Sequence, residues 1–136
     1  MAKKGFTLME LTIVLAILAI IAAILVPLFL RTTDRARLRS DVQSAIVIQN
    51  AMDLYRLERN RPVAGANAAE QLTNLVNADY INPRNTTPQT DGAFWYACTI
   101  DNIVKVNITN VTDSNIHSIA YNLPPAERAI VAGINP

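Results

Sequence analysis

Residues 5–27 read GFTLMELTIVLAILAIIAAILVP, and this stretch decides how the chain of 136 residues is organised. Between Leu11 and Leu30, only Thr12 interrupts a run of apolar side chains. A helix of about 20 residues is about 30 Å long, which matches the thickness of the hydrocarbon core of a bilayer. The stretch therefore predicts a membrane-spanning helix near the N-terminus.

One carboxylate, Glu10, stands at the mouth of this apolar run. A charged side chain in a membrane-spanning segment is costly and usually has a partner, so it indicates a functional site. A nearby ammonium group would offset part of the desolvation cost, because a low dielectric strengthens the attraction. The first turn of a helix also favours a negative charge. Two interpretations are open: Glu10 pairs with a positive group, or it only reaches the lipid headgroups.

A short basic segment, Met1-Ala2-Lys3-Lys4-Gly5, precedes the apolar run. An ordinary secretory signal has a small-residue cleavage site after its apolar region. Here the abrupt junction is Gly5-Phe6, before the apolar region, so cleavage there would leave the helix on the mature chain. The two lysines favour a cytoplasmic N-terminus by the positive-inside rule, although the arginines between Arg31 and Arg39 argue the other way.

The basic stub, the Gly5-Phe6 junction, Glu10, the apolar run and Pro27 together resemble the N-terminus of bacterial type IV pilins and of type II secretion pseudopilins. The resemblance covers about residues 1–60. It implies that a prepilin peptidase cleaves after Gly5 and methylates the new amine of Phe6. It also implies that Glu10 pairs with the Phe6 amine of a neighbouring subunit during assembly.

The resemblance further implies a structural, filament-forming subunit without enzymatic activity. The precursor is expected in the inner membrane, with the large domain outside the cytoplasm, and the processed chain in an extracellular filament. The expected partners are other copies of the chain, the prepilin peptidase, the inner-membrane assembly platform and, before assembly, the lipid bilayer. Three alternatives are open: a periplasmic pseudopilin of a type II secretion system, a minor pilin that binds DNA or a surface, and a membrane-anchored domain that does not assemble.

The helical pattern continues beyond the membrane segment to about Asn60, with one interruption at Pro27. Proline lacks an N–H and crowds the carbonyl four residues earlier, so we expect a kink or local melting there, and the resemblance gives Pro27 a role in assembly. In the outer half, apolar residues recur at spacings of three or four and predict one face packed on the head of the same chain. These residues are Leu38, Val42, Ala45, Ile48, Met52 and Tyr55.

Charge is distributed unevenly along the chain. Residues 31–61 contain seven arginines and four acids, whereas residues 62–136 contain three basic residues and six acids. Opposite charges suit packing of one copy's head on another copy's stalk, but two ordinary solvated surfaces remain an open interpretation. The predicted division is a leader peptide at 1–5, an assembly helix at 6–30, an amphipathic continuation at 31–61 and a globular head at 62–136.

The head reads as a mixture of helix and strand. Val104, Val106 and Ile108 alternate with polar residues, which is typical of a sheet with one face in water. We therefore expect an α+β fold in which a long N-terminal helix, membrane-spanning in its first half, packs on a small antiparallel sheet. The expected elements are a helix at 68–78, strands at 93–100, 103–109 and 116–123, a hairpin turn at Asp101-Asn102, and a helical turn or edge strand at 126–132.

Few residues in the chain suggest catalysis or metal binding. There is one histidine, His117, in a strand-like segment, and one cysteine, Cys98, so a Cys/His metal site and an intrachain disulfide are excluded. Asp113-Ser114-Asn115 and Asp101-Asn102 offer oxygen ligands for calcium, but no regularly spaced calcium loop is present. We expect no catalytic residue, no cofactor and no metal.

Three consecutive aromatic residues, Phe94-Trp95-Tyr96, lie in the first expected strand of the head. Alternation would place Trp95 on one face and the other two rings on the opposite face, and one of these faces is expected in the core. The second face could contact another subunit or stack on single-stranded nucleic acid. The net acidic head argues against non-specific DNA affinity, so nucleic-acid binding is open but unsupported.

Overall fold

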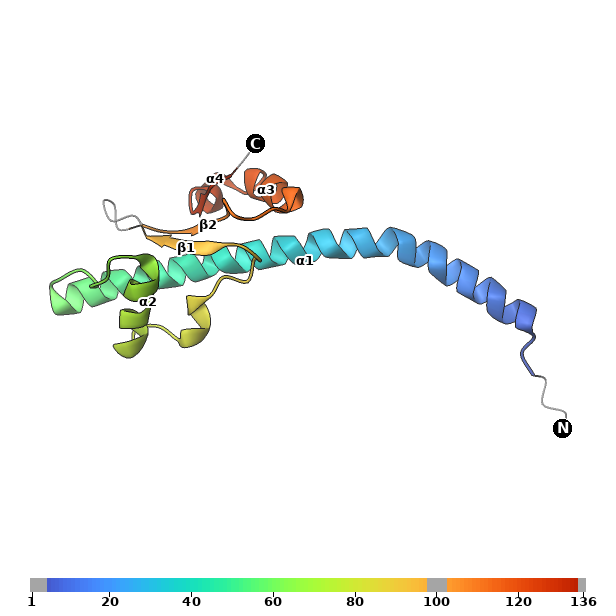
Figure 1. Cartoon of the computed structure of the whole chain (residues 1–136), viewed down its shortest axis with the longest axis horizontal. Helices are drawn as coiled ribbons and strands as arrows, with labels where there is room; N and C mark the ends of the chain where they lie inside the picture. Colours follow the sequence, from blue (N-terminus) through green and yellow to red (C-terminus); the bar gives the residue numbers. More distant parts are fainter. Residues whose placement is uncertain (1–4, 98–102, 135–136) are drawn as a thin grey trace. The chain divides into compact units, whose positions relative to one another are not determined.

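The computed structural model describes residues 5–97 and 103–134, with the side chains of Tyr96 and Ala97 left out. It separates into two compact units, Met1–Thr33 and Asp34–Pro136. The predicted α+β class is confirmed. The elements in Figure 1 are α1 (Leu8–Arg59), α2 (Ala68–Asn77), the 3-10 helix η1 (Pro83–Thr86), β1 (Phe94–Ala97), β2 (Val104–Asn107), α3 (Ser114–Tyr121), α4 (Pro125–Arg128) and β3 (Val131–Ala132).

The first unit contains the N-terminal part of α1, and its surface is almost entirely apolar. Every side chain from Leu8 to Leu30 is exposed. The most apolar 18-residue window of α1 has a mean hydropathy of 3.2, and none of it is buried. By length and composition, this helix can cross a membrane. An exposed surface of this kind is stable only in lipid or against other apolar helices.

Helix α1 continues through Pro27 without a break. Two hydroxyls beyond the proline bond back into the helix, from Thr32 to the Leu28 carbonyl at 2.9 Å and from Thr33 to the Phe29 carbonyl at 3.0 Å. Of the two outcomes expected at Pro27, a kink or local melting, the melting is absent from this conformation of the chain. A role for Pro27 in assembly stays a prediction.

The second unit has a hydrophobic core of its own, built on the outer half of α1. All six residues of the predicted apolar face are buried, from Leu38 to Tyr55, so this prediction is confirmed. They pack in one cluster with residues of α2, the sheet and α3, including Leu75, Val106 and Ala120. The main-chain N–H of Val104 also donates to Gln49 Oε1 at 2.8 Å, which ties β2 to α1.

The sheet is mixed rather than purely antiparallel. Strands β1 and β2 pair antiparallel, as predicted, with Trp95 opposite Val106. Strand β3 joins β2 in parallel, with Val131 also opposite Val106. Val104 and Val106 are buried while Lys105 and Asn107 are half-buried, so the predicted alternation is confirmed. The expected turn at Asp101-Asn102 lies outside the described residues.

The third expected strand, at 116–123, is wrong, because most of this segment lies in helix α3. Asp113 caps the helix, and its side chain accepts a hydrogen bond from the Asn115 N–H at 2.8 Å. Ile116 and Ala120 then lie four residues apart on the buried face. A good N-cap and one helical apolar face therefore make this segment a helix. The segment 126–132, where two outcomes were open, contains both the end of α4 and strand β3.

Helix α2 confirms the short helix expected at 68–78, and it begins with a reciprocal cap. Asn67 Oδ1 accepts from the Glu70 N–H at 2.9 Å, and Glu70 Oε2 accepts from the Ala66 N–H at 2.8 Å. Gly65, just before this cap, has φ +147°, and a Cβ there would lie 2.7 Å from the Gln71 nitrogen. The tight entry into α2 therefore requires glycine.

Candidate functional site

The first turn of α1 is closed by a capping box formed by Thr7 and Glu10. The main-chain N–H and the hydroxyl of Thr7 each donate to Glu10 Oε2 at 2.9 Å. In return, the Glu10 N–H donates to Thr7 Oγ1 at 3.2 Å. This arrangement satisfies helix-end N–H groups that have no partner within the helix. Sequence reasoning missed it, although Thr-x-x-Glu before an apolar run is its ordinary signature.

The capping box fixes where the Glu10 carboxylate lies but does not use all of the hydrogen-bond acceptor positions of this carboxylate. Both bonds from Thr7 reach the same oxygen, Oε2. An ionised carboxylate has about four acceptor positions, so a further donor can still bind. Phe6, whose side chain is 84% exposed, lies directly before the box. The residues expected to act in assembly, Phe6 and Glu10, are therefore close together and open to a second molecule.

A positive partner for Glu10 cannot come from the apolar segment itself. No lysine or arginine occurs between Phe6 and Leu30, and Glu10 is the only acid there. A cation that pairs with this carboxylate must therefore be a lysine of the basic N-terminal segment, a terminal amine or a group from another molecule.

The junction Gly5-Phe6 lies outside the helix and is exposed. A Cβ added at Gly5 would meet no atom within 4 Å, and the glycine does not have a positive φ in the range that excludes side chains. The fold of the chain therefore does not require glycine at this position. A requirement for Gly5 would have to come from an enzyme that reads the junction.

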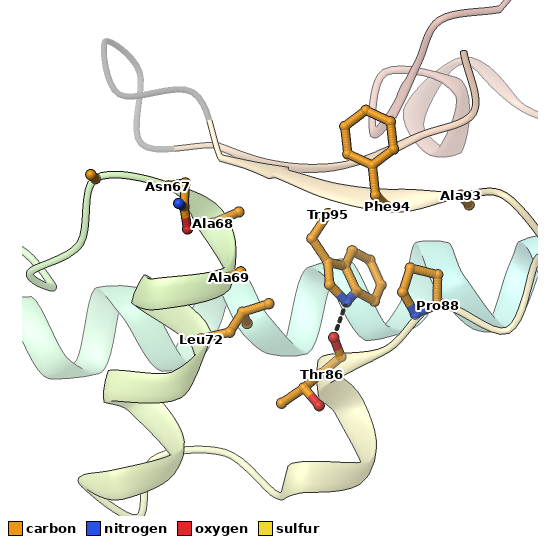
Figure 2. Close-up of a pocket in the computed structure, with 10 residues that line it drawn as sticks. Asn67, Ala68, Ala69, Leu72, Thr86, Pro88, Ala93, Phe94 and Trp95 are labelled. Carbon is orange, nitrogen blue, oxygen red and sulfur yellow. Dashed lines mark hydrogen bonds between the residues drawn. The ribbon is translucent and has the colours of Figure 1, made fainter. Parts of the chain in front are cut away.

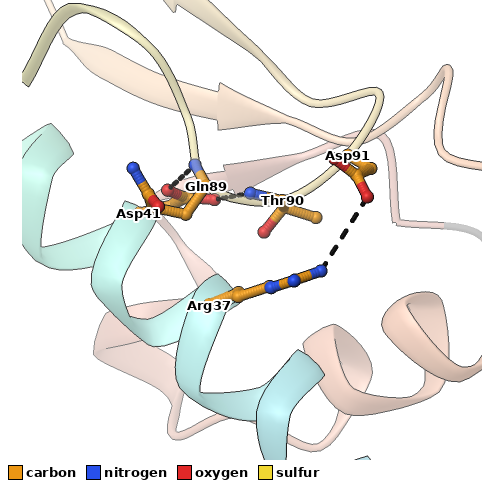
Figure 3. Close-up of polar contacts among 5 residues, drawn as sticks. All are labelled: Arg37, Asp41, Gln89, Thr90 and Asp91. Carbon is orange, nitrogen blue, oxygen red and sulfur yellow. Dashed lines mark hydrogen bonds and ion pairs between the residues drawn. The ribbon is translucent and has the colours of Figure 1, made fainter. Parts of the chain in front are cut away.

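A second carboxylate, Asp41, joins α1 to the segment before β1 (Figure 3). Its Oδ1 accepts from the Gln89 N–H at 2.6 Å and its Oδ2 from the Thr90 N–H at 2.8 Å. Asp41 is 1% exposed, and next to it Arg37 and Asp91 form a looser ion pair with 3.8 Å between nitrogen and oxygen. Sequence reasoning missed this contact. The available signal was an aspartate on the apolar face of a helix.

An apolar cavity of about 610 Å³ lies between α2 and β1 (Figure 2). Trp95 forms part of its wall and donates from Nε1 to the Thr86 carbonyl at 2.9 Å. Trp95 is buried and Phe94 is 39% exposed, so the two rings differ as alternation predicts. The remaining lining residues are Ala66, Asn67, Ala68, Ala69, Leu72, Pro88 and Ala93.

The residues considered for metal binding have other contacts. Asp113 caps α3, and His117 lies on that helix with Nε2 at 2.9 Å from the Val111 carbonyl oxygen. His117 was expected in a strand, so that placement is wrong. In residues 5–97 and 103–134, no three His, Cys, Asp or Glu side chains group in a way that could hold a metal ion. Cys98 and Asp101-Asn102 lie outside these ranges.

Part of the opposite charge on the two segments is already paired within one chain. Arg37 pairs with Asp91, and Arg39 with Glu127 at 3.6 Å. At the end of α1, the uncharged Tyr80 hydroxyl donates a hydrogen bond to the Glu58 carboxylate. The pKa of Arg59 lies above its usual value, first because of its hydrogen bond with Tyr80 and then because of their charge interaction. Packing of one copy's head on another copy's stalk therefore cannot be inferred from net charge alone.

Comparisons with known proteins place this site in a family. A profile described as the prokaryotic N-terminal methylation motif matches residues 1–26. The Thermus thermophilus protein named type IV wide pilus major component PilA4 is 30% identical over 128 residues, covering 85% of this chain and 95% of that protein. The Aeromonas hydrophila type II secretion system core protein G is 32% identical over 76 residues, covering 56% of this chain.

The chain belongs to the family of type IV pilins and type II secretion pseudopilins, which are structural proteins. Its alignment with the core proteins G spans about half of their length, 53% for Aeromonas hydrophila and 56% for Pectobacterium carotovorum. No solved structure matches the chain significantly.

Proposed function

We propose that this chain is a structural subunit of a type IV pilus-like filament. The alignment with the Thermus thermophilus pilus component supports this function most strongly, because it includes the head as well as the N-terminal helix. The exposed apolar surface of the first unit supports it independently, since such a surface needs lipid or other helices around it. The proposal includes the absence of catalysis, which agrees with the structural role of the family.

The proposed pathway begins in the inner membrane, with the lysines of the leader in the cytoplasm and the head on the far side. A prepilin peptidase cleaves after Gly5 and methylates the amine of Phe6. The exposed, non-helical backbone at this junction supports access by an enzyme. The match of residues 1–26 to the methylation motif supports both modifications.

The single observation that carries the assembly step is the position of Glu10. It is the only charged side chain between Phe6 and Leu30, and Thr7 holds its carboxylate at the start of an exposed apolar helix. We propose that the liberated Phe6 amine of one copy binds the Glu10 carboxylate of the next. Apolar helices move from lipid to one another at little gain in hydrophobic free energy, so this charge pair can determine their register.

A second candidate function is that of a pseudopilin in a type II secretion system, assembled in the periplasm with the inner-membrane platform. The similarity to several core proteins G favours it. We place it second because those alignments cover only about half of each relative, whereas the pilus component is covered almost completely. Binding of DNA or a surface by a minor pilin remains a further alternative without a supporting contact in the described residues.

Imaging of sheared cell-surface material, with mass spectrometry of the N-terminus of its main protein, tests the proposed function. We expect filaments whose subunit begins at N-methylated Phe6. Short assemblies confined to the periplasm would favour the pseudopilin. Only monomeric chain in every fraction would contradict both.

The Gly5→Leu variant tests the cleavage step separately. We expect uncleaved precursor in the membrane, because the peptidase no longer recognises the junction, while the head folds normally. The matched control is Ala2→Leu, which adds the same side chain to the leader away from the junction and should be processed. Efficient processing of Gly5→Leu would contradict the proposed site.

A further inference from the structure

Helix α1 has a second apolar face in the head unit, on the side away from the core. Ile46, Val47, Leu54 and Leu57 are 36%, 41%, 48% and 84% exposed, and we call them the outer stripe. At about 100° of rotation per residue, they fall within an arc of about 100°, roughly opposite the buried face. Between Gln43 and Leu57, this arc contains no charged residue.

The outer stripe ends among basic side chains. Arg56, Arg59 and Arg61 surround Leu57 in the sequence, against Asp53 and Glu58. Three arginines against two acids give this end of the helix a small net positive charge. An apolar ridge with a basic end is therefore available for a partner with an apolar groove and an acidic rim.

The cavity between α2 and β1 has the complementary character. Its walls are mainly small and apolar side chains of α2, β1 and the segments before them. Asn67 and Thr86 are its polar members, and no basic residue lines it. Glu70 follows Ala69 on α2, and the two line an adjoining hollow together with Asn67. The cavity volume of about 610 Å³ is large enough for more than one leucine side chain. No residue of the outer stripe is part of its lining.

We propose that this cavity is the docking site for the outer stripe of a second copy of the chain, with Leu57 and Leu54 entering it and the arginines around Leu57 facing Glu70. This proposal rests on the proposed filament function and names the contact between heads. The ridge and the groove are different residues of one unit, so the contact is heterologous. Heterologous contacts that do not close on themselves build open helical assemblies, which is the symmetry that a filament needs.

Cysteine cross-linking in intact filaments tests this contact. The chain carries Leu57→Cys and Ala69→Cys in a Cys98→Ser background, which removes the only native cysteine. Sheared filaments are treated with a short bis-maleimide and separated on a denaturing gel. We expect a ladder of covalent oligomers, because every copy then contributes a ridge thiol and a groove thiol.

The matched control replaces Ala69→Cys by Ser118→Cys, an exposed position on α3 that is not part of the cavity. A ladder of equal strength from this pair would overturn the proposal. Filaments of normal yield without a ladder would overturn the docking site alone. Strong dimers from Leu57→Cys by itself would also overturn it, because they would show stripe-to-stripe packing. An unsubstituted chain that forms no filaments would overturn the proposed function, and the docking site with it.

A substitution at the centre of the ridge gives a second, independent readout. Leu57→Glu should reduce filament yield about tenfold, which is the loss expected when one leucine no longer leaves water. Unfolding of the head, followed by the fluorescence of the single tryptophan, Trp95, should not change, because Leu57 is 84% exposed. Leu57→Met should assemble normally. Normal filament yield from Leu57→Glu would overturn the proposal.

Discussion

The two units of this chain treat their carboxylates in opposite ways. In the head unit, Asp41 is buried and both of its oxygens accept main-chain N–H groups of the same chain. In the N-terminal unit, Glu10 is exposed on an apolar helix, and in the described residues its carboxylate accepts hydrogen bonds only from Thr7. Each oxygen of Asp41 therefore has a hydrogen-bond partner within the chain, whereas Glu10 can still accept a donor from a second molecule.

Packing shows the same difference between the units. The head has a continuous core that includes residues from α1, α2, the sheet and α3. From Leu8 to Leu30, by contrast, no side chain is buried. The head therefore has the core that it needs to be stable alone, whereas the N-terminal helix needs lipid or other apolar helices around it. Each prediction below changes one of these two properties and leaves the other unchanged.

Removing the Glu10 carboxylate should have the largest effect. We expect Glu10→Ala and Glu10→Gln to insert in the membrane and to be cleaved after Gly5, but filament yield should fall to background. The reason is that no other acid between Phe6 and Leu30 can receive the amine of a neighbour. Electron microscopy of sheared material, with immunoblots of the processed chain, measures both steps.

The matched control for this loss is Thr12→Val, which removes the polar side chain two residues further along the same helix. The Thr12 hydroxyl bonds only to the Met9 carbonyl at 2.9 Å within the described residues, so assembly should be retained. Normal filaments from Glu10→Ala would show that assembly does not depend on the Glu10 carboxylate. Equal loss from Thr12→Val would show that the helix is sensitive to any polar change.

Removing the Asp41 carboxylate should have the largest effect on the stability of the head. Asp41→Ala leaves the buried Thr90 N–H without its acceptor, and we expect the free energy of unfolding to fall by about 3 kcal/mol. Denaturant unfolding of the full chain in detergent, followed by Trp95 fluorescence, measures this change. Processing at Gly5 should be unaffected. A change below about 0.5 kcal/mol would mean that the carboxylate does not hold this segment.

Loss of the α2 cap should have an intermediate effect. Asn67→Ala removes the acceptor of the Glu70 N–H, and capping substitutions of this kind typically lower the free energy of unfolding by about 1 kcal/mol. The same fluorescence measurement applies. Asn67→Asp is the control, because it keeps a capping oxygen, and it should restore most of the stability. If Asn67→Asp is as unstable as Asn67→Ala, the cap is not the cause.

Breaking the surface ion pair next to Asp41 should have the smallest effect. Asp91 is 97% exposed and lies 3.8 Å from Arg37, so Asp91→Ala should change the free energy of unfolding by less than about 1 kcal/mol. This variant also serves as the control for Asp41→Ala, since it removes a carboxylate from the same region. An effect as large as that of Asp41→Ala would show that the two acids act as one network.

Much of this arrangement could be predicted from the sequence because its signals are local and repetitive. The apolar run up to Leu30 predicts a membrane-spanning helix by length alone, and spacings of three or four from Leu38 to Tyr55 predict the buried face. Alternation around Val104 and Val106 predicts a strand with one wet face. Each of these predictions depends only on residues that are close together in the sequence, so it needs no knowledge of tertiary contacts.

The predictions that were wrong or missing concern helix caps and contacts between distant parts of the chain. The strand predicted at 116–123 is wrong because Asp113 caps a helix there and Ile116 and Ala120, four residues apart, form its buried face. Strand β3 pairs with β2 in parallel across an intervening pair of helices, and nothing local specifies that register. The contact made by Asp41 could not be predicted, because its partners are the main-chain N–H groups of Gln89 and Thr90, far along the chain.

The central claim is that the freed Phe6 amine of one subunit binds the Glu10 carboxylate of the next, and zero-length cross-linking tests it most directly. Filaments grown from a mixture of ¹⁴N- and ¹⁵N-labelled chains are treated with a carbodiimide, which joins an amine to a carboxylate only where they touch. Mass spectrometry should find Phe6 joined to Glu10 in peptides that combine the two isotopes. Filaments whose subunits still begin at Met1, or in which Phe6 joins only to Glu10 of its own chain, would contradict the claim.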